Sequence, residues 1–346
     1  MKEYLLSCGE PQFRISDATS HSLISKTCLA YLAQFDGQDY RNRSRLRDHP
    51  LARYAAKHWI HHGLCGDVDS EVRHQQLALN LFRRDDTFMN WIKTRYRHRQ
   101  KSDVAEPIYY ASEAGLREVV RVLLEDGADV NAQGREGSAL LVASLEGHEA
   151  IVKILLGYGA DVNVHGEWYG SALEAASSIG HEAIVKMLLE SHADVGDALY
   201  QASSGGHEAI VKMLLENGAD VNAQGGMSGS ALQAASSGGH EAIVKILLDY
   251  HADVDGALHQ ASSGGHEAIV KMLLENGADV NAQGGMNGSA LQEASLRGHE
   301  AIVKLLLENG ADVNALGGWI DSALRQASSG GHEAIVKMLL EHGALQ

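Results

Sequence analysis

Apolar residues recur at helical spacing in one stretch that the chain repeats many times, and residues 206–238 show the pattern clearly. In "HEAIVKMLLENGADVN" four apolar positions fall on one face of a helix: Ile210, Val211, Leu214 and Leu215. Glu208 and Lys212 stand four residues apart on the opposite face, where they can pair. Gly218 follows the last apolar position, where a left-handed residue commonly ends a helix. The pattern predicts an amphipathic helix.

A shorter pattern lies between these stretches. "SALQAASSGG" combines small residues with one leucine and ends in glycines, which predicts a short helix that can approach a neighbour closely. "NAQGGMSG" is rich in glycine and turn-forming residues and predicts a protruding turn or hairpin, called the finger below. Each unit is therefore expected to be a helix pair plus a finger.

The unit occurs eight times. The string "GHEAIVK", or its degenerate form "GLREVVR" in the first unit, begins at eight glycines: Gly115, Gly147, Gly180, Gly206, Gly239, Gly265, Gly298 and Gly331. The spacings between them are 32, 33, 26, 33, 26, 33 and 33 residues. Because one helix pair cannot bury its apolar face alone, the units are expected to stack into a solenoid.

Residues 103–346 resemble the ankyrin repeat, in the runs "SAL", "GHEAIVK", "LL" and "GADVNA". The resemblance implies an all-α solenoid of about eight helix-pair units, two of them without the finger, after a small helical cap domain at residues 1–102. The usual T-P-L-H box is mostly S-A-L-x here, and only Pro107 and His259 keep its proline or histidine. Five serines are expected to cap the first helices instead: Ser138, Ser171, Ser230, Ser289 and Ser322.

The two short units lack seven residues of the finger. Their joints, "ADVGDAL" at 193–199 and "ADVDGAL" at 252–258, each carry a glycine beside an aspartate, which suits a tight turn. Residues 147–205 and 206–264 align as two copies of a 59-residue double unit. Duplication of a repeat pair explains the two deletions without a functional role; the alternative is that they shape a notched concave surface.

The copies differ mainly at the finger tips and at the residue after Ala-Leu in the first helix. In ankyrin proteins these positions line the concave groove, so the resemblance places a protein-binding site there, and exposed aromatic and Met side chains are typical interface anchors. The alternative is that the Trp and Met residues pack on a neighbouring finger. The candidate protein-binding residues are Arg135, Glu136, Trp168, Tyr169, Glu174, Tyr200, Met227, Gln233, His259, Met286, Gln292, Trp319, Ile320 and Arg325.

The first hundred residues predict four helices, around 19–35, 50–62, 68–84 and 86–99, with Pro50 just inside the second. Their expected core is Leu23, Cys28, Leu32, Tyr54, Trp59, Leu79, Phe88, Trp91 and Ile92. This domain is expected to cover the open end of the first repeat. Three segments, "KEYLLS", "CLAYLAQF" and "PLARYAAKHWIHHG", resemble the helical linker before the ankyrin repeats of fungal NACHT-type receptors. That resemblance implies an alternative function, a structural or self-assembly arm of such a receptor.

Charge divides the chain at the same boundary. Residues 1–102 hold 17 Lys/Arg against 11 Asp/Glu, and residues 103–346 hold 12 against 34. The acidic repeats favour a basic protein partner and disfavour nucleic acid, although two basic runs lie at 41–47 and 93–101. Docking of these runs on the acidic repeats is a further hypothesis. We expect a monomer or weak self-association.

No motif argues for an enzyme or a cofactor, since the chain has no P-loop, dinucleotide-binding or nucleophile-elbow pattern. The repeated "HE" lacks the second histidine of a zinc helix, so these histidines are expected to bond loop backbone. His58, His61, His62 and Cys65 are spaced as a metal site would need, but no second ligand cluster accompanies them, and no metal is expected. The three cysteines suit no disulfide framework, and no stretch is apolar enough for a signal peptide or a membrane span. A cytoplasmic protein that does not enter membranes is expected.

Overall fold

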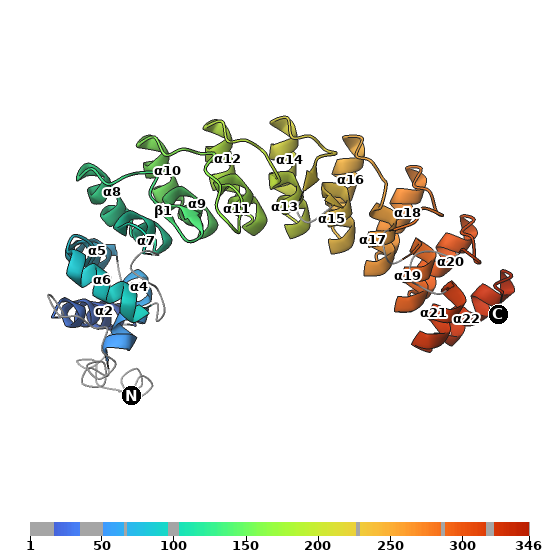
Figure 1. Cartoon of the computed structure of the whole chain (residues 1–346), viewed down its shortest axis with the longest axis horizontal. Coiled ribbons are helices and arrows are strands. Elements are labelled where there is room, and N and C mark those ends of the chain that lie inside the picture. The colour runs from blue at the N-terminus through green and yellow to red at the C-terminus, as the bar shows by residue number, and fades with distance from the viewer. Residues whose placement is uncertain are drawn as a thin grey trace. The chain divides into compact units, whose positions relative to one another are not determined.

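The computed structural model describes residues 17–34, 51–65, 68–95, 104–225, 229–284, 288–315 and 322–345. The chain forms two compact units, Met1–Tyr169 and Gly170–Gln346. The first unit contains the cap helices and the first two helix pairs, and the second unit contains the remaining helix pairs (Figure 1).

Among the described residues, four helices precede the repeats, as the sequence predicts: α2 (Asp17–Ala33), α4 (Ala52–Leu64), α5 (Val68–Phe82) and α6 (Asp85–Arg95). Seven of the nine expected core residues are buried: Cys28, Leu32, Trp59, Leu79, Phe88, Trp91 and Ile92. The prediction was wrong for Leu23 and Tyr54, which are 60% and 45% exposed. Both lie out of phase with the buried stripe of their helix, which in α2 runs through Cys28 and Leu32. Pro50 lies outside the described residues.

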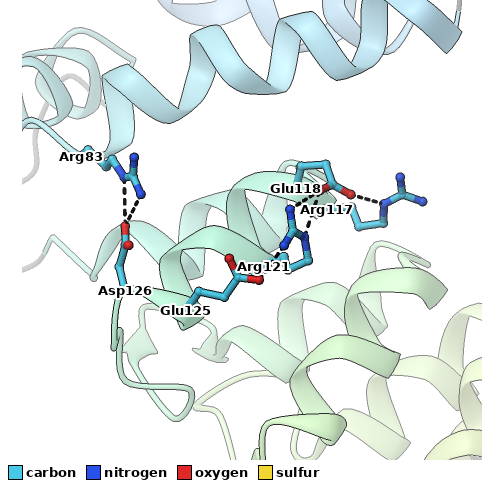
Figure 2. A network of polar contacts seen from close by, with 6 residues as sticks. All are labelled: Arg83, Arg117, Glu118, Arg121, Glu125 and Asp126. Carbon is cyan, nitrogen blue, oxygen red and sulfur yellow. Dashed lines mark hydrogen bonds and ion pairs between the residues drawn. The ribbon is translucent and has the colours of Figure 1, made fainter.

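The cap packs on the first repeat, which confirms the expected covering of its open end. The rings of Phe88 and Trp91 lie 5.7 and 6.1 Å from the ring of Tyr110 in α7 (Pro107–Glu113), between ring centroids. Gln75 Oε1 accepts a hydrogen bond of 2.6 Å from the backbone amide of Glu118, at the start of α8 (Arg117–Glu125). Glu118 in turn joins a surface network of ion pairs along α8 (Figure 2).

The first unit continues with one finger and a second helix pair. The finger is a hairpin of β1 (Gln133–Gly134) and β2 (Gly137–Ser138), paired antiparallel with Gln133 opposite Ser138. The helices that follow are α9 (Ala139–Leu145) and α10 (Glu149–Gly157).

The second unit is built from two rows of helices, with the first helix of each pair on the inner side of the curve in Figure 1. The first helices are α11 (Ala172–Ile179), α13 (Ala198–Gly205), α15 (Ala231–Gly238), α17 (Ala257–Gly264), α19 (Ala290–Arg297) and α21 (Ala323–Gly330). The second helices are α12 (Glu182–Glu190), α14 (Glu208–Glu216), α16 (Glu241–Asp249), α18 (Glu267–Glu275), α20 (Glu300–Glu308) and α22 (Glu333–Glu341). Strands β3 (Gln224–Gly225) and β4 (Gly229–Ser230) form one finger hairpin, and a single bridge joins Gln283 to Ser289 in another.

The local signals act as the sequence predicts in nearly every repeat. In α14 the four apolar side chains of the predicted face are buried, and Lys212 Nζ lies 2.6 Å from Glu208 Oε1. Gly218 after α14 has a φ of 86°, which is left-handed. Four of the five expected serine caps accept a hydrogen bond from the third residue of the helix: Ser138, Ser171, Ser230 and Ser289. Ser322 makes no such bond, so this cap was predicted wrongly.

The repeated histidines connect adjacent repeats. His207 Nε2 lies 3.2 Å from the carbonyl oxygen of Ser178, near the end of α11, which is the first helix of the preceding repeat. Gly180 must be a glycine, because a Cβ there would lie 2.6 Å from the His207 ring and its φ is 94°. The same bond recurs in both units, which confirms the expected backbone role of these histidines: His148 to Glu113, His240 to Ser204, His266 to Ser237, His299 to Ser263 and His332 to Leu296.

Candidate functional site

The two fingers of the first unit present side chains to solvent. In the first finger, Arg135 is exposed and Glu136 is half-buried, and the backbone amide of Glu136 lies 3.4 Å from the hydroxyl of Tyr109. Tyr109 is buried beneath Gly134, where a Cβ would lie 2.4 Å from its ring. The hairpin therefore packs on an aromatic side chain of the preceding helix, and the charged residues Arg135 and Glu136 lie at its tip.

The second finger carries two exposed aromatic side chains. Trp168 is 72% exposed and Tyr169 is 42% exposed. An indole with this exposure has little packing against its own chain, which argues against the alternative that Trp168 only covers a neighbouring finger. Exposing large apolar side chains has no benefit for folding, and clusters of them are typical of interaction sites.

Three of the six first-helix candidates are placed differently from the sequence-based expectation. Glu174 and His259 are each 9% exposed and Gln292 is 1% exposed, so these three are buried rather than presented to a partner. Tyr200 and Gln233 are half-buried, and Arg325 is exposed. Glu174, Gln233 and Gln292 are bonded within their own helix caps: the side chain of Glu174 reaches Ser171 Oγ, and the side chains of Gln233 and Gln292 accept the amides of Ser230 and Ser289.

Several of these first-helix side chains instead contact the joint that leads to the next repeat. Gln233 Nε2 donates to the carbonyl oxygen of Asp255 at 2.7 Å, and Gln292 Nε2 donates to that of Ala315 at 3.1 Å. Tyr200 lies against Gly225, where a Cβ would be 2.7 Å from the Cβ of Tyr200. The physical reason is that helical side chains tilt toward the N-terminus of the helix, which here faces the following joint.

A second set of bonds joins the loops of successive repeats. In the first unit, Asn131 Oδ1 accepts the backbone amide of Asp161 at 2.8 Å. In the second unit the same bond joins Asn222 to Asp253, Asn281 to Asp312 and Asn314 to Leu345. Gly196 and Asp255 replace the asparagine at the two short joints. Among the described residues, the amides of the next repeats, those of Asp220 and Asp279, donate no such hydrogen bond.

Four candidates lie outside the described residues: Met227, Met286, Trp319 and Ile320. They stay predictions. The basic run at 41–47 lies there too, and the run at 93–101 is described only as far as Arg95, so docking of either run on the repeats also stays a prediction.

Two exposed aromatic residues were missed by the sequence reasoning. Tyr158 and Tyr250 are 48% and 46% exposed and follow α10 and α16. Other copies have an asparagine at this position, such as Asn217. The comparison between copies that singled out the finger tips could therefore have found these two tyrosines as well.

His62 of α4 is hydrogen-bonded to His21 of α2 and to Tyr54 of its own helix. His62 Nδ1 lies 2.7 Å from His21 Nδ1, and His62 Nε2 lies 2.8 Å from the hydroxyl of Tyr54. His61 Nε2 lies 3.9 Å from Cys65 Sγ, which is at the limit of a weak contact. Within the described ranges, no three His, Cys, Asp or Glu side chains are grouped so that they could hold a metal ion.

Membrane insertion finds no support in the described helices, none of which is both long and apolar enough to cross a bilayer.

Helix pairs in two rows, joined by regular bonds between neighbours and decorated with exposed fingers, define a helical repeat protein. The chain belongs to the ankyrin-repeat family: the family model for ankyrin repeats (3 copies) matches residues 85–166, 140–225, 199–284 and 258–345. Ankyrin repeats are a general module for protein–protein interaction.

Two further proteins show similarity. The structure of the human ASB11 ankyrin repeat domain superposes with a TM-score of 0.54 at 26% identity, covering 60% of this chain and 99% of that domain. A protein of Monascus ruber named azaphilone pigments biosynthesis cluster protein L is 34% identical over 155 residues, or 38% of this chain. The match spans 33% of the length of that relative.

Proposed function

We propose that the chain is a non-enzymatic recognition module that binds a partner protein through its finger tips and the exposed parts of its first helices. The observation that carries this proposal is the 72% exposure of Trp168 beside the exposed Tyr169 on a finger. Arg135 and Arg325 add exposed charge, and Tyr200 adds a half-buried aromatic ring. Tryptophan, tyrosine and arginine are the residue types that most often dominate interface energies.

The partner is expected to be basic, and the chain itself is expected to be cytoplasmic. Residues 170–346 hold 8 Lys/Arg against 22 Asp/Glu, a net charge of −14 for the second unit. A surface of this sign attracts basic proteins and repels phosphate backbones. We do not extend the proposal to Glu174 and Gln292, because their burial and their bonds to neighbouring segments serve the repeat array itself.

Affinity capture with the immobilised chain tests the proposal. The Trp168→Ala, Tyr169→Ala double variant should lose captured proteins that the unaltered chain retains, because alanine removes the aromatic anchors. The matched control is Tyr158→Ala, Tyr250→Ala, which removes two similarly exposed rings away from the fingers. If the finger variant retains the same proteins as the unaltered chain, or if both variants lose them equally, the fingers are not the binding surface.

A structural arm of a NACHT-type receptor remains the alternative. The family match begins at residue 85, so the segments that carry the NACHT resemblance lie before it. Self-association measured by sedimentation over a range of concentrations distinguishes the two functions, since an assembly arm should pair with its own kind at micromolar concentration.

A further inference from the structure

The tip of the second finger combines exposed aromatic side chains with an exposed carboxylate. Glu167, Trp168 and Tyr169 are consecutive residues of a turn, and all three are exposed. Trp168, at 72%, is the most exposed large aromatic side chain in the part of the chain that the structure describes. An indole with this exposure offers a ring face to a ligand.

The first finger lies directly beside this tip. A Cβ on Gly166 would collide with the backbone carbonyl oxygen of Glu136, and a Cβ on Gly137 would lie 3.1 Å from the Cα of Gly166. The backbones of the two fingers are therefore in contact. Their tips form one surface, called the double finger below, which consists of Arg135, Glu136, Glu167, Trp168 and Tyr169.

The charges of the double finger are not used within the chain. Among the described residues, the side chains of Arg135, Glu136 and Glu167 have no ion-pair or hydrogen-bond partner. By contrast, Arg117 and Arg121 of α8 are paired with glutamates of their own helix (Figure 2). Two carboxylates and one guanidinium are thus left to interact with a ligand, and the carboxylates are in excess.

The repeats that carry the double finger are acidic as well. Residues 104–169 hold 4 Lys/Arg against 11 Asp/Glu. Two of the four cations, Arg117 and Arg121, are already neutralised by ion pairs. The electrostatic field at this surface therefore favours a cationic ligand and disfavours a phosphate-bearing one.

Arginine is the cation that suits an exposed indole beside carboxylates. Its guanidinium is planar and weakly hydrated, so it can stack on an aromatic face while its N–H groups donate to carboxylate oxygens at the edge of the ring. The ammonium of lysine is compact and strongly hydrated, and it lacks the planar face. An aliphatic side chain would cover the indole but would leave the carboxylates without a partner.

We propose that the double finger binds an arginine side chain of the partner protein, with the guanidinium stacked on Trp168 and paired with Glu136 and Glu167. Tyr169 extends the aromatic surface beside the arginine. Arg135 opposes this binding by charge repulsion. The inference rests on the proposed recognition function, because it names the residue of the partner that the fingers would recognise.

Titration of the full chain with the peptide acetyl-Gly-Gly-Arg-Gly-Gly-amide tests the proposal, followed through the indole N–H resonance of Trp168. Citrulline in place of the arginine gives a neutral peptide of the same shape, and lysine gives a charged peptide without the planar group. The arginine peptide should shift the resonance in a saturable way and bind at least about three-fold more tightly than the lysine peptide, and the citrulline peptide should cause no shift. Equal shifts with arginine and citrulline, equal affinities for arginine and lysine, or no shift with any peptide would overturn the proposal.

Matched variants separate local pairing from overall charge. Glu167→Gln should lower the affinity for the arginine peptide about three-fold, the loss expected for one exposed ion pair. Glu149→Gln makes the same change of charge on an exposed residue of α10 and should leave the affinity unchanged. Arg135→Gln should raise the affinity about two-fold, because it removes a like charge. Equal losses in the two glutamate variants, or a loss in Arg135→Gln, would contradict the assignment.

The basic run at 41–47 is a second source of arginine within the chain, with arginines at positions 41, 43, 45 and 47. Changing these four residues to serine should leave the affinity for the arginine peptide unchanged. A rise of more than about three-fold, beyond the effect of one exposed charge pair, would show that the double finger binds this run instead of a partner. If the Trp168→Ala, Tyr169→Ala variant loses its captured proteins but the arginine peptide does not bind, the arginine inference is rejected and the recognition function stands.

Discussion

Asn222 accepts a hydrogen bond from the backbone amide of Asp253, one repeat further along the chain, with 2.8 Å between the nitrogen and Oδ1. The bond recurs in most repeats, and within the described part of the chain it is absent where the short joints replace the asparagine with Gly196 and Asp255. Each short joint thus removes both a finger and one bond between neighbouring loops.

Amide hydrogen exchange should reveal this difference residue by residue. The amides of Asp220 and Asp279, which follow the short joints, should exchange at least about five-fold faster than those of Asp253 and Asp312, because a hydrogen bond contributes about 1 kcal/mol net. Exchange resolved by NMR measures all four sites in one chain. Equal protection at the four amides would mean that the short joints are not weak points in the array.

The short units also carry histidine where other copies have glycine. His192 and His251 both have a φ of 61°, in the left-handed region, at the position of Gly218. Replacing either histidine with glycine should raise the free energy of unfolding by about 0.5–1 kcal/mol. Glycine removes the penalty that a side chain carries in the left-handed conformation, and the greater entropy of glycine in the unfolded chain offsets part of this gain. The reverse change, Gly218→His, should lower it by a similar amount. Urea unfolding measures these changes, and a loss of stability in His192→Gly would show that the imidazole makes a compensating contact.

The serine that caps α15 and a serine within α15 should respond differently to alanine. Ser230 Oγ accepts the amide of Gln233 as the helix cap, so Ser230→Ala should cost about 1 kcal/mol. Ser236 Oγ is buried without a hydrogen-bond partner among the described residues, so Ser236→Ala should be neutral or stabilise by up to about 1 kcal/mol. Thermal unfolding of the two variants side by side checks the pair. Equal destabilisation would show that Ser236 is hydrogen-bonded in solution.

The stability of the chain should depend on His259 at mildly acidic pH. Burial lowers the pKa of His259 below the ordinary 6.5, and Glu293 opposes this only in part. The unfolded chain therefore binds a proton more readily than the folded chain, so the contribution of His259 is fully present above pH 6.5 and is lost as the pH falls through the lower pKa of the folded state. Urea midpoints should fall more steeply between pH 7 and about pH 5 for the unaltered chain than for His259→Gln, which cannot titrate. Identical slopes would contradict the lowered pKa.

The sequence predicted the repeats well because each copy carries complete local signals. Gly218 ends its helix, Ser230 caps the next one, and Ile210 faces the core, and none of these depends on distant residues. The surface was predicted less well. Variation between copies identified both Trp168 and Gln292, but only the first is exposed. Whether a side chain contacts solvent or the next joint depends on its tilt and on the length of the following finger. The exposure of these side chains is therefore set by two adjacent repeats together and not by the sequence of one repeat.

Binding of a partner protein by the exposed fingers can be observed on the fingers themselves. The most direct measurement is amide exchange of the chain alone and with a captured partner, compared over the finger segments 131–138 and 163–170 and over the second helices α14 and α16. With the partner bound, exchange should be slower in the finger segments, including the amides of Trp168 and Tyr169, and should change little in α14 and α16. Slowed exchange confined to the second helices, with the fingers unchanged, would contradict it.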